Sequence, residues 1–70
     1  MNAPQKQEHA ALRASYHKAA ADAAKKTALV RALAAKGPRA IQVASETAAK
    51  AVRRRNVLAA QLAALGVVDL

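Results

Sequence analysis

The sequence predicts an all-α protein with a single domain, residues 1–70, folded as a two-helix antiparallel hairpin. Glycine and proline are scarce, with two of each, whereas alanine, leucine, lysine and arginine, which favour helices, dominate the chain. One Gly-Pro pair lies near the middle. On both sides of this pair, apolar residues recur at spacings of three and four, the period of an amphipathic helix. We therefore expect helices at about residues 4–36 and 38–65.

The turn between these helices is predicted at Gly37-Pro38. Glycine suits the left-handed position just past a helix end, and proline suits the first turn of the following helix. A proline also disfavours helical geometry in the residue before it. The segment from Lys36 to Arg39 is therefore expected to end one helix and begin the next, so that the two helices fold back against each other.

The first helix is expected to begin at Pro4, with Asn2 or Ala3 as its N-cap. Larger apolar side chains recur on one face of it, and alanines fill the same face at mid-length. Because alanine is small, we expect the two helices to approach most closely there. The face consists of Leu12, Tyr16, Val30 and Leu33, with Ala19 and Ala23 between them.

The second helix carries a stripe in alternating steps of three and four, the pattern of coiled-coil-like packing. Gly66 is expected to end this helix in a left-handed conformation, with Val67 folding back on Leu62. Residues 66–70 then form a short apolar tail. The stripe consists of Ile41, Ala44, Ala48, Ala51, Arg55, Leu58, Leu62 and Leu65.

Arg55 is the exception in this stripe. A charge at a seam position costs stability unless it is paired, and its best-attested role is to fix register or oligomeric state. Counting back from the turn places Arg55 opposite residues 19–23. We therefore expect it to pair with Asp22 or to stack on Tyr16.

The larger apolar residues are too few for a monomeric core of normal depth. The chain has no Phe or Trp and one Tyr, and a hairpin of this size buries only one stripe per helix. We expect two hairpins to associate as a homodimer in a four-helix bundle. The predicted residues of the core and dimer are Leu12, Tyr16, Val30, Leu33, Ile41, Arg55, Leu58, Leu62 and Leu65.

The chain is strongly basic, with 12 Lys and Arg against 4 Asp and Glu and a formal net charge of +8. This balance favours an acidic protein surface or nucleic acid as partner. A membrane is not expected as partner, because the Trp and Phe that anchor interfacial helices are absent. Leu29, Val43 and Val57 lie outside the apolar stripes and could extend a dimer interface or dock a partner helix. The residues expected to bind a partner are Lys18, Lys25, Lys50, Arg53, Arg54 and Val57.

The sequence offers no constellation for catalysis or for a cofactor. Cysteine is absent, the acidic residues are dispersed, and no glycine-rich phosphate loop is found. His9 and His17 are two helical turns apart and lack further ligands, so no metal site is expected. We expect no enzyme activity, no cofactor and no small-molecule substrate. No secretory signal or membrane-spanning run is recognisable, so the expected location is cytoplasmic.

Two functions remain, and we favour the first. The protein is expected to be a small regulatory or adaptor protein that binds a partner protein stoichiometrically through the basic outer face of a helical dimer. Phages and plasmids use small proteins of this kind to inhibit host proteins. The alternative is binding of RNA or DNA by a dimeric basic four-helix bundle. Basic residues fall on both flanks of the expected hairpin, whereas a nucleic-acid binder usually concentrates them on one face.

Overall fold

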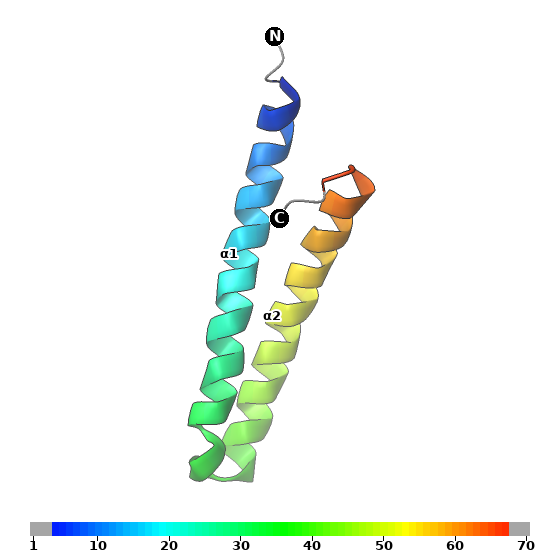
Figure 1. Cartoon of the computed structure of the whole chain (residues 1–70). Helices are drawn as coiled ribbons and strands as arrows, with labels where there is room; N and C mark the ends of the chain where they lie inside the picture. The colour runs from blue at the N-terminus through cyan, green and yellow to red at the C-terminus, as the bar shows by residue number, and fades with distance from the viewer. Residues whose placement is uncertain (1–3, 68–70) are drawn as a thin grey trace.

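The computed structural model describes residues 4–67, with side chains from residue 9 onward. The helix α1 spans Pro4–Ala32, a short 3-10 helix η1 spans Ala34–Lys36, and α2 spans Pro38–Ala64. The two long helices lie side by side in opposite directions, and the first turns of α1 extend past the end of α2 (Figure 1). Within the described range the chain is helical without strands, which confirms the predicted all-α hairpin.

The turn differs from the prediction in how the first helix ends. The α-helix stops at Ala32, so the prediction that it continues to residue 36 is wrong. The amide of Leu33 still donates to the carbonyl of Leu29 at 2.9 Å, but the amide of Lys36 donates to the carbonyl of Leu33 at 2.9 Å. This tighter 3-10 turn redirects the chain before the glycine is reached.

Gly37 has the predicted positive φ, but its backbone is not left-handed helical. Its φ of 112° and ψ of 166° lie in a region that is essentially restricted to glycine. Gly37 is thus a single residue of extended backbone that joins η1 to α2. Pro38 follows at the start of α2, as predicted.

The end of α2 follows the sequence prediction closely. Gly66 has a φ of 84°, and its amide donates to the carbonyl of Ala63 at 3.0 Å. The amide of Val67 donates to the carbonyl of Leu62 at 2.9 Å, and the Val67 side chain is buried. This pair of bonds is a Schellman cap, which confirms the predicted return of Val67 to Leu62. The tail residues 68–70 and the predicted N-cap at Asn2 or Ala3 lie outside the described residues.

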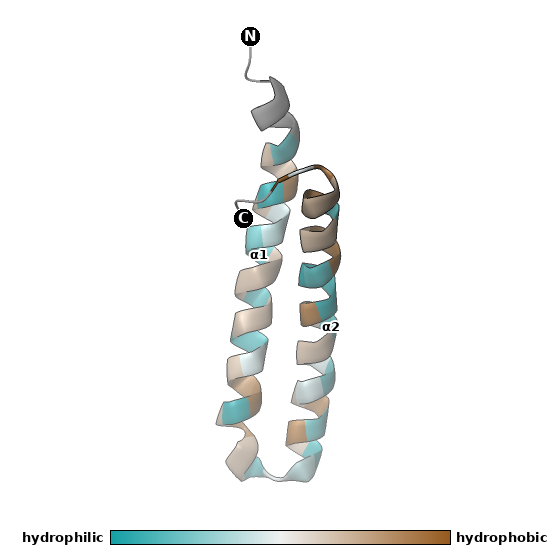
Figure 2. Cartoon of the chain, turned by 45° about the vertical axis from the view of Figure 1, so that its right-hand side comes forward, coloured by the Kyte–Doolittle hydropathy of each residue, from teal (hydrophilic) through white to brown (hydrophobic). Residues whose placement is uncertain are grey.

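Alanine forms most of the contact between the helices. Leu62 is the only large side chain described as fully buried, at 0% exposure. The larger apolar residues predicted for the core line the edges of this contact and are half-buried: Leu12, Tyr16, Val30, Leu33, Ile41 and Leu58. Strong hydrophobic colour consequently appears only at scattered points of both helices (Figure 2). The buried residues are Ala19, Ala23, Ala44, Ala48, Ala51, Leu62 and Val67.

Two residues of the predicted stripe differ in placement from the expectation. Leu65 is 53% exposed, because the helix ends one residue before it. Arg55 is half-buried, and its Nε and Nη2 atoms donate to Asn56 Oδ1 at 3.2 and 2.9 Å. The predicted pair between Arg55 and Asp22 is wrong, because Asp22 binds Lys26 one turn along its own helix.

Candidate interaction groove

Three adjoining hollows follow one side of the contact between α1 and α2. All three share Lys26 as a lining residue, and we call this row of hollows the Lys26 groove. It begins between Ser15 and Leu58 and ends between Leu33 and Ala40, near the turn. The groove has a basic half toward the open end of the hairpin and an apolar half toward the turn.

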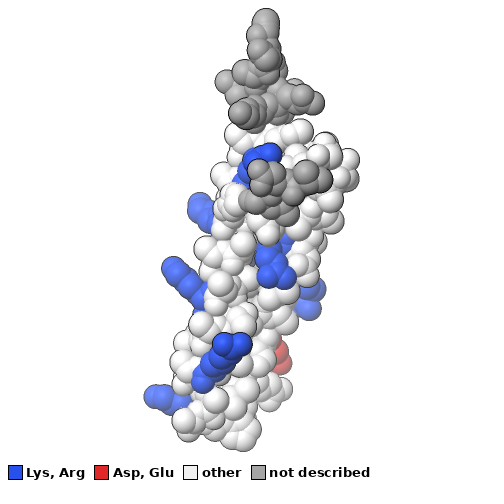
Figure 3. Space-filling view, in the orientation of Figure 1, with Lys and Arg blue, Asp and Glu red and all other residues white. Residues whose placement is uncertain are grey.

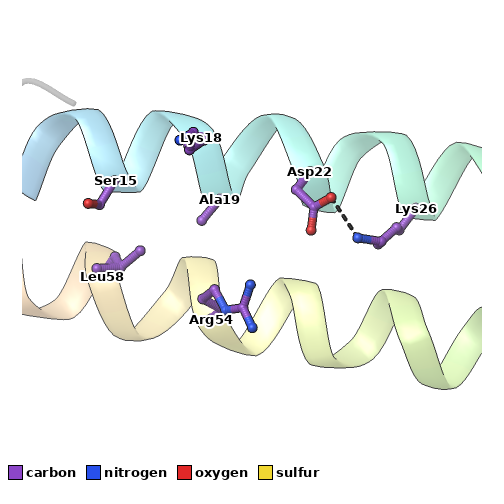
Figure 4. Close-up of a pocket in the computed structure, with 7 residues that line it drawn as sticks. All are labelled: Ser15, Lys18, Ala19, Asp22, Lys26, Arg54 and Leu58. Atoms are coloured by element: carbon purple, nitrogen blue, oxygen red, sulfur yellow. Dashed lines mark hydrogen bonds and ion pairs between the residues drawn. The ribbon is translucent and has the colours of Figure 1, made fainter.

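The basic half gathers cations from both helices around one carboxylate. Lys18, Asp22 and Lys26 come from α1, and Lys50 and Arg54 come from α2. The Lys26 Nζ atom lies 2.6 Å from Asp22 Oδ1. The Arg54 side chain extends from α2 toward Asp22, across from Ala19 (Figure 4). Four cations thus line the same half of the groove as a single anion.

The electrostatics of Asp22 reflect this crowding. The hydrogen bond from Lys26 is the largest influence and lowers the pKa of the Asp22 carboxyl below its ordinary value of 3.8. The charges of Lys26, Arg54 and Lys25 lower this pKa further, whereas partial desolvation opposes them. Asp22 is therefore ionised at neutral pH, and one negative charge leaves the basic half positive.

The apolar half combines exposed aliphatic residues from the two helices. Leu29 of α1 is 48% exposed and Val43 of α2 is 60% exposed, yet both line the same hollow. Both residues lie outside the apolar stripes of their own helices. Only the antiparallel packing of the two helices brings them onto one surface. The hollow is completed by Leu33, Ala40, Ala44 and Thr47, with Lys26 at its edge.

The predicted partner-binding residues divide into two groups. Lys18, Lys50 and Arg54 line the groove. Lys25 and Arg53 are exposed but do not line it, and Val57 is 57% exposed beyond its edge. Basic side chains lie over both helices on the face seen in Figure 3, with little acidic surface between them.

The opposite side of the helix contact has a different chemistry. Arg55 and Arg31 line a hollow there, together with small residues of α1. Arg54 and Arg55 thus belong to opposite sides, because one residue along a helix is a rotation of about 100°. The small residues are Ala20, Ala23, Ala24, Thr27 and Ala28.

Among the side chains that the structure describes, residues 9–67, no group of three or more His, Asp or Glu is arranged to hold a metal ion. Within residues 4–67, neither helix has a segment of the length and hydropathy needed to cross a bilayer. Comparison of the chain with protein-family models, curated proteins and solved structures finds no match.

Proposed function

We propose that this chain is a small non-enzymatic regulatory or adaptor protein of the cytoplasm. It binds an acidic surface of a partner protein stoichiometrically, as the small inhibitors of phages and plasmids do. The observation that carries this proposal is the Lys26 groove, where four cations and one carboxylate adjoin exposed aliphatic side chains. Such a surface offers charge for steering a partner and apolar area for holding it.

The proposal includes a homodimer, which would form a four-helix bundle. The chain exposes 5200 Å², about 1,000 Å² more than a folded monomer of this mass exposes on average. Its radius of gyration is 15.6 Å, against about 11 Å for a compact domain of this length. A standard interface buries about 800 Å² per partner, which is comparable to the excess.

We assign the dimer contact to the alanine side of the hairpin, around Ala20, Ala24 and Ala28. A symmetric dimer formed through the Lys26 groove would bring the cations of one copy against the cations or the apolar half of the other. Both arrangements are unfavourable, because like charges repel and burying an unpaired charge is costly. The alanine side brings only two cations per copy to the contact, Arg31 and Arg55, against four in the groove, and dimerisation through it leaves both grooves accessible.

Protein is favoured over nucleic acid because of the apolar half of the groove. A phosphate backbone has no apolar groups to cover Leu29 and Val43, whereas a protein surface does. Nucleic-acid binding is the alternative, supported by the basic side chains that both helices present on one face (Figure 3). The two functions predict different responses to nuclease.

The deciding experiment is affinity capture from a bacterial lysate at about 0.15 M salt, with and without nuclease. Lys50→Glu/Arg54→Glu reverses two cations of the groove. Lys25→Glu/Arg53→Glu is the matched control, because it reverses one Lys and one Arg outside the groove and gives the same net charge. We expect a defined partner protein that survives nuclease and is lost only with the groove variant. Loss of all captured protein after nuclease would support the nucleic-acid alternative instead.

A further inference from the structure

We propose that the Lys26 groove binds one amphipathic helix of the partner, on which acidic residues and aliphatic residues occupy separate halves of the same face. The acidic half lies over Lys18, Lys50 and Arg54, and the aliphatic half lies over Leu29 and Val43. This inference rests on the proposed function and specifies the element of the partner that is recognised.

The dimensions of the groove fit a single helix. The groove follows the contact line of two antiparallel helices, and a third helix laid along that line packs against both. Ser15 of α1 and Leu33, the residue that follows α1, mark the two ends of the groove and are 18 positions apart. This separation corresponds to about 27 Å, or about five helical turns of the partner.

The basic half lacks the carboxylates that its cations could bind. Among the side chains of residues 9–67, the only ion pair joins Lys26 and Asp22. Lys18 and Lys50 therefore face the groove without an acidic partner from the part of the hairpin that the structure describes, and Arg54 has beside it only the Asp22 carboxylate that Lys26 already binds. Carboxylates at spacings of three and four on a docked helix would reach cations of both α1 and α2.

The apolar half requires a different partner chemistry. Leu29 and Val43 are about half exposed, and the remaining wall is mostly alanine and leucine, so a charged side chain would lose its hydration there. Aliphatic anchors at positions i, i+3 or i+4, and i+7 of a docked helix would cover this area. The change from basic to apolar lining along one groove thus dictates separate acidic and aliphatic halves in the partner.

Two synthetic helical peptides of about 20 residues, long enough to cover the groove at 1.5 Å per residue, test this pattern on the full-length protein. Both contain the same Glu and Leu residues on one face. In the segregated peptide the Glu residues fill one half of the face and the Leu residues fill the other; in the mixed peptide they alternate. Fluorescence anisotropy should give at least about a tenfold lower Kd for the segregated peptide.

Matched variants locate the binding site. Val43→Asp places a charge in the apolar half, and Val57→Asp makes the same change at a comparably exposed position outside the groove. We expect Val43→Asp to weaken binding of the segregated peptide at least about tenfold, and Val57→Asp to change it less than about threefold. Lys50→Glu/Arg54→Glu should likewise weaken binding far more than Lys25→Glu/Arg53→Glu. Circular dichroism verifies that all variants remain helical.

Equal affinities for the two peptides, or no binding of either at about 100 µM, would overturn the inference. So would equal losses for Val43→Asp and Val57→Asp. If a partner protein is nevertheless captured after nuclease treatment, the proposed function survives and only helix docking fails. If an RNA or DNA duplex binds with losses confined to the charge-reversal variants, both the helix and the protein partner are wrong.

Discussion

Leu62 is the one large side chain among the described residues that is fully buried between the helices. It is fully buried, while its buried neighbours in the hairpin are alanines and Val67. Leu65, three positions further along, is 53% exposed. The same residue type therefore has two different roles within one helical turn.

We predict that Leu62→Ala lowers the free energy of unfolding by about 3 kcal/mol, because it removes buried methyl groups and leaves a cavity. Leu65→Ala should lower it by less than about 1 kcal/mol, as expected for a surface position. Urea denaturation followed by circular dichroism measures both values. Similar losses for the two variants would mean that the packing at Leu62 is not as described.

Asp22 is predicted to make folding stability depend on pH in the acidic range. Its pKa in the folded chain is lowered, so the folded state binds this proton less readily than the unfolded chain does. The resulting stabilisation is present above about pH 4 and is lost as the pH falls through the folded pKa. Asp22→Asn removes this contribution, so the variant should lose less stability than the wild type between neutral pH and about pH 2.

Thermal melts across this pH range provide the measurement. The other carboxyl groups titrate in both proteins, so the difference between the two curves isolates Asp22. Parallel curves for wild type and Asp22→Asn would contradict the lowered pKa.

The two glycines that end helices differ in what they require of the backbone. Gly66 occupies the left-handed C′ position of α2, which asparagine also tolerates. Gly37 lies in an extended region with positive φ that other residues scarcely adopt. At both positions the space that a Cβ atom would enter is open, with no atom within 4 Å, so any cost of a side chain comes from the backbone alone.

We therefore predict that Gly37→Asn costs about 2 kcal/mol or more and that Gly66→Asn costs about 1 kcal/mol or less. Denaturant unfolding of the two variants gives the comparison. A larger loss of unfolding free energy for Gly66→Asn would show that the cap of α2, and not the turn at Gly37, has the stricter requirement for glycine.

Local sequence signals predicted the elements better than they predicted the groove. Gly37-Pro38 located the turn and Gly66 located the cap, because each depends on a few neighbouring residues. The end of α1 was missed, since no residue near Ala32 opposes a helix and the 3-10 turn arises from closing the hairpin. The pair between Arg55 and Asp22 was predicted wrongly because a small rotation of α2 decides whether Arg54 or Arg55 reaches the side of Asp22. The apolar half was missed because Leu29 and Val43 meet only through the register of both helices.

At the scale of the whole molecule, we predict a dimer with twice the chain mass of 7.3 kDa. Light scattering measures this mass, and the melting temperature should rise with protein concentration, since association stabilises the folded state. Ala24→Glu on the alanine side should shift the protein toward monomer, whereas Ala21→Glu, at an exposed position that does not line that hollow, should not. A stable monomer with a concentration-independent melting temperature would refute the dimer.

The alanine contact also determines where the protein tolerates mutation. Two stiff helices that touch through their smallest side chains lie close together where the buried alanines meet. A larger side chain at Ala23 or Ala48 would act as a spacer, pushing the helices apart. That displacement would increase the distance between Lys26 of α1 and Arg54 of α2 without a change to either residue. The shape of the Lys26 groove thus depends on buried alanines that do not line it.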